Sequence, residues 1–178
     1  MTKLPEKIIK GCKKQDTKAQ MQFYNMYYKI VYNSCFRILS NAMDAEDAMQ
    51  ESFLKAFNKI DTWEDVPIEA WLKRIAINTS IDKLKKQKAI LIELDERLPV
   101  IDEPYNEEEI NWKEEEVKRA IFELTDNYRL ILTLHLLEGL DYGEISELLN
   151  MKEGTVRVQF ARARQKLLEQ LRMKNICA

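Results

Sequence analysis

Residues 142–160 read YGEISELLNMKEGTVRVQF, and this stretch predicts two short helices joined by a tight turn. Asp141 and Glu144 have the spacing of a capping pair that starts the first helix. Asn150 follows that helix, and asparagine tolerates the left-handed conformation that a tight turn requires. Ser146 is small enough for the two helices to cross closely. The pattern is that of a helix-turn-helix, with apolar anchors at Ile145, Leu149, Met151, Val156 and Phe160.

The second helix of this pair continues beyond residue 160 and has a polar and basic side. The N-terminal residues of a recognition helix reach base edges in the major groove, and later arginines meet phosphates. The expected outer stripe comprises Thr155, Gln159, Arg162 and Lys166, flanked by Arg157 and Arg164. The competing interpretation is an αα-hairpin with a solvated basic face, but such hairpins seldom satisfy all the turn constraints together.

Composition favours helix along the whole chain of 178 residues, which contains only four Gly and four Pro. We therefore predict an all-α fold made of two small helical domains joined by an acidic linker. The predicted boundaries are 1–90 for the first domain, 91–111 for the linker and 112–178 for the helix-turn-helix domain. The net charge of −2 hides a basic–acidic–basic pattern along the chain, so it does not exclude nucleic acid as a partner.

Three helices are expected in the first domain. Asp16 can cap a helix that runs to about Leu39, and a second helix starts near Asp44 with acidic residues in its first turn. A third helix, over residues 68–88, is apolar around most of its circumference. Its narrow polar stripe comprises Arg74, Asn78, Asp82 and Lys85.

The sequence argues against several functional classes. It has no paired nucleophile and base, no metal-ligand spacing and no glycine-rich phosphate loop, so we expect no enzyme, metal, cofactor or small-molecule substrate. The three cysteines are widely spaced, and His135 lies in an apolar run where packing is its expected role. The sequence has no signal peptide and no apolar run of the ~20 residues that span a bilayer, so we expect no membrane insertion and a cytoplasmic location.

Three segments in order resemble the extracytoplasmic-function group of the sigma-70 family. They are DAEDAMQESFLKAF (44–57), WLKRIAINTSIDKLKKQK (71–88) and EGLDYGEISELLNMKEGTVRVQFARARQKL (138–167). The resemblance implies a transcription initiation factor that binds core RNA polymerase and directs it to promoter DNA. A stand-alone helix-turn-helix regulator remains the alternative, although such a regulator would not need the first domain. An anti-sigma factor is a further candidate partner.

The resemblance also implies where each partner binds. The first domain reads the −10 element, and the Asn that matches Asn78 lies beside a base flipped from the non-template strand. The residues expected at the −10 element are Arg74, Asn78, Asp82, Lys83, Lys85 and Lys86. Those expected to bind core polymerase are Asp44, Asp47, Gln50, Glu51 and Phe53.

The second domain is expected to read the −35 element. Positions that match the family's contacts there are Arg157, Val158, Gln159, Arg162 and Arg164. The sequence leaves open whether Arg157 reads guanine or clamps a phosphate. Val158 stands where relatives often carry serine, and it suits a thymine methyl group instead. The promoter sequence that the chain prefers therefore remains open.

Overall fold

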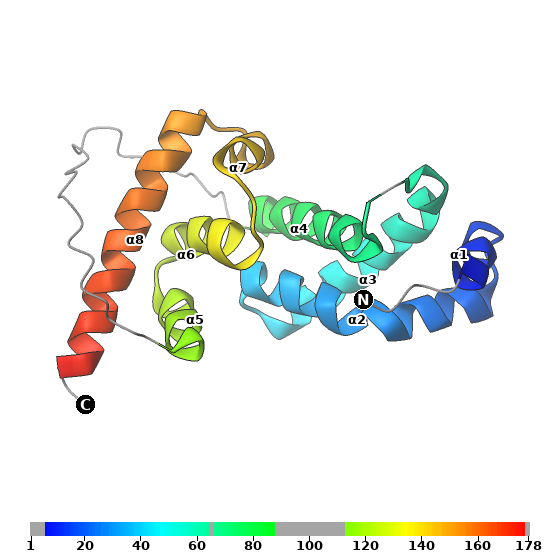
Figure 1. Cartoon of the computed structure of the whole chain (residues 1–178), viewed down its shortest axis with the longest axis horizontal. Coiled ribbons are helices and arrows are strands. Elements are labelled where there is room, and N and C mark those ends of the chain that lie inside the picture. The colour runs from blue at the N-terminus through cyan, green and yellow to red at the C-terminus, as the bar shows by residue number, and fades with distance from the viewer. Residues whose placement is uncertain (1–5, 65, 88–112, 177–178) are drawn as a thin grey trace. The chain divides into compact units, whose positions relative to one another are not determined.

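The computed structural model describes residues 6–64, 66–87 and 113–176, and in these ranges it contains helices and turns with no strand (Figure 1). The all-α prediction is thereby confirmed. The helices divide into two compact units, with the division falling between residues 89 and 90. The predicted acidic linker, 91–111, lies outside the described residues, and its boundaries remain a prediction.

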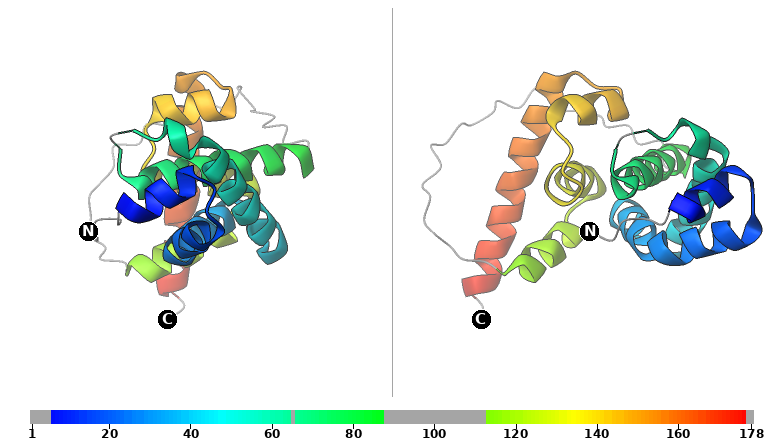
Figure 2. Two further views of the ribbon diagram at one scale, coloured as in Figure 1. Left: turned by 90° about the vertical axis from the view of Figure 1, so that its right-hand side faces the viewer. Right: turned by 45° about the vertical axis from the view of Figure 1, so that its right-hand side comes forward.

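In the part of the first unit that the structure describes, there are four α-helices and a short 3-10 turn. The helices are α1 (Glu6–Lys13), α2 (Thr17–Leu39), α3 (Ala42–Lys59) and α4 (Ile68–Gln87), and the turn is η1 (Ile60–Thr62). Helices α2, α3 and α4 pack against one another, and Figure 2 shows α1 folded back against the start of α2. The sequence interpretation did not include α1.

The ends of these helices follow from local capping residues. The carboxylate of Asp16 accepts hydrogen bonds from the backbone N–H groups of Lys18 (2.8 Å) and Ala19 (3.0 Å), as expected for the start of α2. Ser40 ends α2 in the left-handed conformation, with φ 54°. Asn41 then caps α3 by accepting from the Asp44 backbone N–H at 3.0 Å, so that helix begins two residues earlier than predicted.

An aromatic cluster holds α2 and α3 together. Phe23 and Phe53 lie edge to face with ring centroids 6.4 Å apart, and Phe57 lies 5.8 Å from Phe23. The Phe53 ring also contacts Tyr24, at 4.8 Å. Full burial of a Phe side chain contributes about 1.5–3 kcal/mol, so this cluster is a major part of the first core.

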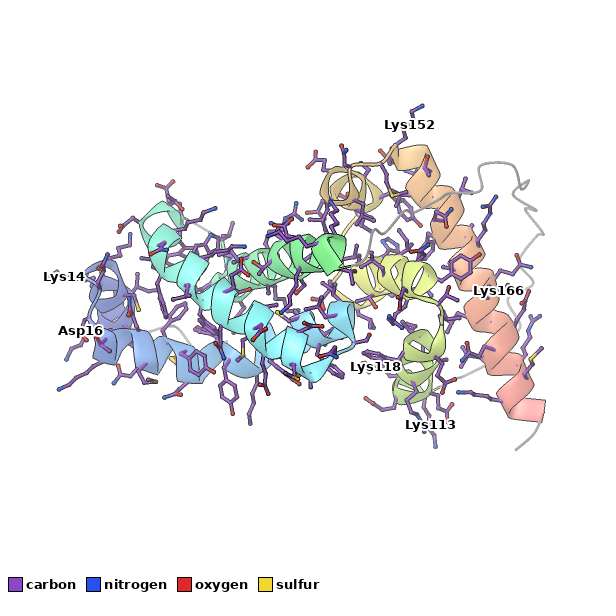
Figure 3. All side chains as sticks on the ribbon, turned by 180° about the vertical axis from the view of Figure 1, so that it is seen from behind. Lys14, Asp16, Lys113, Lys118, Lys152 and Lys166 are labelled. Carbon is purple, nitrogen blue, oxygen red and sulfur yellow. The ribbon has the colours of Figure 1, made fainter. Side chains whose placement is uncertain are left out.

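The second unit is built on one long helix. Helix α8 (Glu153–Ile176) packs against α5 (Glu114–Glu123), α6 (Asp126–Leu132) and α7 (Tyr142–Leu149), as Figure 1 shows. The buried core of this unit comprises Ala120, Ile121, Leu132, Ala163, Leu167 and Leu171. Figure 3 marks Lys152 immediately before α8 and Lys166 midway along it.

The segment between α5 and α7 contains two different elements. Helix α6 starts at Asp126 and passes into a π-helical turn, η2 (Thr133–Leu137). The wider turn closes with a hydrogen bond of 3.0 Å from the Glu138 N–H to the Thr133 carbonyl, five residues back. Gly139 ends the turn with φ 77°, as glycine allows.

Candidate nucleic-acid interface

The helix-turn-helix forms as its sequence predicts. The Asp141 carboxylate accepts from the Glu144 backbone N–H at 2.7 Å, while the Glu144 carboxylate accepts from the Asp141 N–H at 3.0 Å. Asn150 has the left-handed geometry, with φ 56° and ψ 51°. The Met151 N–H then donates to the Ser146 carbonyl at 2.9 Å. These bonds fix the direction in which α8 leaves the turn.

The buried side of α8 is wider than the sequence analysis expected. Gln159 was placed on the outer stripe, but its side chain is only 8% exposed, so that placement was wrong. It follows Val156 by three residues and precedes Ala163 by four, and a helix puts such positions on one face. Both of these neighbours are buried. Thr155, also expected on that stripe, is half-buried.

The remaining candidates on α8 are accessible to different degrees. Arg157, Arg164 and Lys166 are exposed, while Val158 and Arg162 are half-buried. Lys166 pairs with Glu169 at 2.8 Å, and this hydrogen bond is the main reason that the Lys166 pKa is raised.

Arg157 is held from two sides. Its Nε and Nη2 atoms donate to the same oxygen of Glu153, at 3.1 and 2.6 Å. Its guanidinium carbon lies 4.7 Å from the centroid of the Tyr142 ring, which is a cation–π geometry. Neither partner was expected from the sequence, although Glu153 and Arg157 have the i, i+4 spacing of a helical ion pair.

The Tyr142 ring is itself held in place by two other rings, those of His135 and Phe160. It stacks on His135 with centroids 4.6 Å apart and contacts the edge of Phe160 at 5.6 Å. The Nδ1 atom of His135 lies 2.7 Å from the Leu140 carbonyl oxygen. The expectation that His135 packs in the fold is therefore confirmed.

In the first unit, most of the −10 candidates lie along one accessible side of α4. Asn78, Asp82, Lys85 and Lys86 are exposed, and Arg74 is half-buried. Asn78 and Asp82 are one helical turn apart, so their side chains point in similar directions. This face combines an amide with lysine ammonium groups, which suits a single nucleic-acid strand.

Lys83 does not share this arrangement. Its Nζ atom pairs with Asp44 at 3.2 Å and with Asp47 at 3.0 Å, and its side chain is only 19% exposed. Burial alone would lower the Lys83 pKa, but the hydrogen bonds and charges of the two aspartates outweigh it, and the pKa is raised. In the structure, the Lys83 ammonium group is bound by Asp44 and Asp47, two of the residues expected to bind polymerase. A contact between Lys83 and DNA stays a prediction.

The polymerase-binding candidates on α3 also need one correction. Asp47, Gln50 and Glu51 are exposed, but Phe53 is only 3% exposed and belongs to the aromatic core, so it is not available to a partner. The accessible apolar residue is its neighbour Leu54, at 65% exposure.

Met43, at 78% exposure, supplies a second accessible apolar side chain near the start of α3. Met43, Asp47, Gln50 and Leu54 recur at three- and four-residue spacing, and this set is the outer face of α3. The same spacing, applied to the sequence, was enough to select Leu54 in place of Phe53.

The described residues include no helix long and apolar enough to cross a membrane. Within 6–64, 66–87 and 113–176, no group of three or more His, Cys, Asp or Glu side chains is arranged to hold a metal ion.

Two family profiles match the chain. Residues 23–90 match the profile described as Sigma-70 region 2, and residues 114–167 match Sigma-70, region 4. The ECF RNA polymerase sigma factor SigW of Bacillus subtilis is 32% identical, over 97% of this chain and 99% of the relative. SigM of the same species is 31% identical, over 82% of this chain and 91% of the relative.

Solved structures share the fold. The sigma factor RpoE from Bartonella quintana, solved in complex with the anti-sigma factor NepR, superposes with a TM-score of 0.54 at 22% identity. That alignment covers 85% of this chain and 96% of the other. CnrH, solved with the cytosolic domain of CnrY, superposes with a TM-score of 0.52 at 20% identity.

Proposed function

The chain belongs to the extracytoplasmic-function group of the sigma-70 family, and we propose how its two helical units divide the work of a transcription initiation factor. The function itself is to bind core RNA polymerase and direct it to specific promoters. In our proposal, the unit within residues 112–178 reads the −35 element through α8. The unit within residues 1–90 binds polymerase through α3 and captures the −10 element through α4.

The observation that carries the −35 assignment is the turn around Asn150. Its left-handed geometry forms the tight turn between α7 and α8, and the first residues of α8 after it, Glu153 and Gly154, are exposed. Four basic side chains follow within the first fourteen residues of α8, namely Arg157, Arg162, Arg164 and Lys166. Phosphate attraction supplies most of the non-specific affinity of such a surface. Gln159 is not part of this proposal, because it is buried.

The −10 assignment depends on Asn78. An exposed amide can donate and accept at once, so it can recognise the Watson–Crick edge of an unstacked base. Lys85 and Lys86, near the end of the same helix, would lie along the strand's phosphates. Each unit alone would bind its element weakly, and their linkage through one polymerase raises the joint affinity.

We further propose that the outer face of α3 contacts core polymerase. Its two exposed apolar side chains, Met43 and Leu54, lie on either side of Asp47 and Gln50. An apolar and acidic surface of this kind fits a partner helix with apolar and basic residues. In this proposal, Lys83 on α4 orients Asp44 and Asp47 through its two ion pairs and does not contact DNA.

Three further parts of the account are proposals of the same kind. The chain has no catalytic activity of its own, since its work is recognition. It acts in the bacterial cytoplasm, where core polymerase and promoter DNA are found. An anti-sigma factor is a candidate regulator, because the structurally similar sigma factor RpoE was solved in complex with the anti-sigma factor NepR. The stand-alone regulator is not favoured, since the family matches include both units.

Site-specific crosslinking tests this division of labour. A photoreactive amino acid is placed singly at Asn78, Val158 or the control Asn33, an exposed residue of α2, and each variant is assembled with core polymerase on one promoter. We expect position 78 to crosslink to the non-template strand at −10 and position 158 to crosslink at −35. A crosslink from position 158 to −10, or from position 78 to protein alone, would contradict the proposal.

A further inference from the structure

The sequence left the role of Arg157 undecided between a guanine edge and a phosphate, and the contacts of its side chain separate these roles. One oxygen of the Glu153 carboxylate accepts from Nε and Nη2 of Arg157, so the carboxylate lies at the side of the guanidinium plane. Both side chains are about half exposed, with 60% for Arg157 and 48% for Glu153. The pair therefore lies at the surface, in the first two turns of α8, where a recognition helix meets base edges.

This contact leaves the end of the guanidinium fork available. An arginine carries five N–H donors. Glu153 engages Nε–H and one hydrogen of Nη2, so the Nη1 hydrogens and the second Nη2 hydrogen are directed away from it. Two parallel donors from Nη1 and Nη2 are the set that pairs with O6 and N7 of guanine in the major groove.

The same contact disfavours a phosphate as the partner of Arg157. A phosphate would bring its negative charge close to the Glu153 carboxylate, which already neutralises this arginine. A guanine edge presents neutral acceptors and does not carry this repulsion. The Glu153 carboxylate therefore lowers the general affinity of Arg157 for DNA phosphates and raises its selectivity for a base.

The Tyr142 ring fixes the guanidinium plane from the other side. Arg157 lies over this ring at 4.7 Å, and the ring is held by His135 and Phe160 at 4.6 and 5.6 Å. Because Tyr142 is the first residue of α7, the capping box of that helix also fixes where its ring stands. Arg157 is thus oriented by both helices of the helix-turn-helix.

We propose that Arg157 reads one guanine of the −35 element, and that Glu153 and Tyr142 are positioning residues that make this contact selective. The inference rests on the proposed assignment of α8 to the −35 element. Beyond that assignment, it identifies the base that Arg157 recognises. It also identifies Glu153 and Tyr142 as residues that determine specificity without touching DNA.

The test uses holoenzyme assembled from the full chain and core RNA polymerase. Promoters randomised across the −35 element are selected by transcription, and the enriched sequences are compared between variants. The variants are Arg157→Ala, Arg157→Lys, Glu153→Gln, Tyr142→Leu and the control Glu147→Gln. Glu147 is exposed on α7, so its substitution makes the same change of charge in the same unit. The melting temperature of each variant and its use of the −10 element are measured in parallel.

We expect the wild type and the control to enrich guanine at one −35 position. Arg157→Lys keeps the charge but loses the fork, so the preference for guanine should fall on the order of ten- to a hundredfold. Glu153→Gln and Tyr142→Leu should each lower it about three- to tenfold while leaving −10 use unchanged, and Glu153→Gln should strengthen binding to non-specific DNA.

Two outcomes overturn the inference, and they differ from each other. If Arg157→Lys keeps the full base preference, or if Glu153→Gln and Tyr142→Leu leave it unchanged, Arg157 is a phosphate contact and the positioning role is wrong. If the promoters enriched by the wild type and by every variant share no −35 sequence at all, the assignment of α8 to that element fails, and the inference fails with it.

Discussion

The Nζ atom of Lys83 on α4 lies 3.0 Å from the Oδ2 atom of Asp47 on α3, although 36 residues separate the two in sequence. This contact joins the helix proposed to meet the −10 element to the helix proposed to meet polymerase. Lys83 also pairs with Asp44, so one ammonium group holds two carboxylates at the start of α3. The two ion pairs of Lys83 therefore connect α4 to the start of α3.

Replacing Lys83 by methionine therefore tests its structural role. We expect the free energy of unfolding to fall by roughly 0.5–1 kcal/mol, the upper range for surface ion pairs, because the Lys83 side chain is mostly covered and two carboxylates lose their partner. The salt dependence of promoter binding should stay unchanged. The control Lys86→Met, at an exposed lysine of the same helix, should instead reduce the salt slope by about one unit. Equal slopes for wild type and Lys86→Met, with a reduced slope for Lys83→Met, would show that Lys83 meets DNA after all.

Asn78→Ala should impair promoter melting and leave polymerase binding intact. Loss of the amide removes hydrogen bonds to an unstacked base, and we expect the stability of the open complex to fall roughly tenfold. Permanganate footprinting of unpaired thymines measures the melted strand, and fluorescence anisotropy measures binding to core enzyme. Asn33→Ala, at an exposed asparagine of α2, is the matched control. Weakened core binding in Asn78→Ala would count against the −10 assignment.

Phe53 and Leu54 are adjacent on α3, but the Phe53 side chain is buried and the Leu54 side chain is exposed. Phe53→Ala should lower the free energy of unfolding by about 3–5 kcal/mol, because it leaves a cavity in the aromatic cluster. Leu54→Ala should change stability by less than about 0.5 kcal/mol and weaken binding to core polymerase about fivefold or more. Chemical denaturation and anisotropy titration give the two quantities. Normal core affinity in Leu54→Ala would remove the outer face of α3 from the polymerase interface.

Gly11 permits the close approach of α1 to α2. A Cβ atom at this position would lie 2.4 Å from the Cβ atom of Ala19, a distance that neither atom can relieve by rotating a side chain. We expect Gly11→Ala to lower the free energy of unfolding by about 1–2 kcal/mol, despite the better helix propensity of alanine. The control is Gly154→Ala in α8, where a Cβ atom would meet nothing within 4 Å. This control should raise stability by up to about 1 kcal/mol. A stabilising Gly11→Ala would show that α1 is not packed in this way.

Glu123 gives the second unit a dependence on pH. The hydrogen bond from Lys174 is the main cause that lowers the Glu123 pKa, with a further hydrogen bond from Gln170. A carboxylate with a lowered pKa in the folded state adds stability above its unfolded value, near 4.3, and this contribution is lost as pH falls through the folded value. The wild type should therefore lose more stability between pH 6 and pH 3 than Glu123→Gln does, by at most about 1 kcal/mol because the pair is exposed. Thermal melts across this range measure the difference. Parallel curves for the two proteins would contradict it.

Structural features that depend only on residues close together in the chain could be predicted from the sequence. The capping pair of Asp141 and Glu144, the cap at Asp16 and the left-handed Asn150 are each determined within four residues, and all three were found as expected. The order of motifs also identified the family, because each motif is a local pattern.

Features set by packing between distant segments could not be predicted in the same way. The partners of Lys83 lie on another helix, whereas the spacing of Gln159 from Val156 and Ala163 already indicated its burial. The π-turn at residues 133–137 leaves no clear pattern in composition. Leu54 differs, since helical spacing alone would have placed it beside Gln50 on the accessible face. The sequence thus shows which polar residues belong to a site more readily than it shows which face of a helix each of them occupies.

The most direct test of the central claim is transcription in vitro with the purified chain, core RNA polymerase and a fragmented genomic library, followed by sequencing of the RNA 5′ ends. The account predicts discrete start sites that require the chain and share two spaced upstream motifs, with a guanine in the upstream motif whose use depends on Arg157. Start sites that appear equally without the chain, or an absence of start sites despite binding to core enzyme, would contradict it.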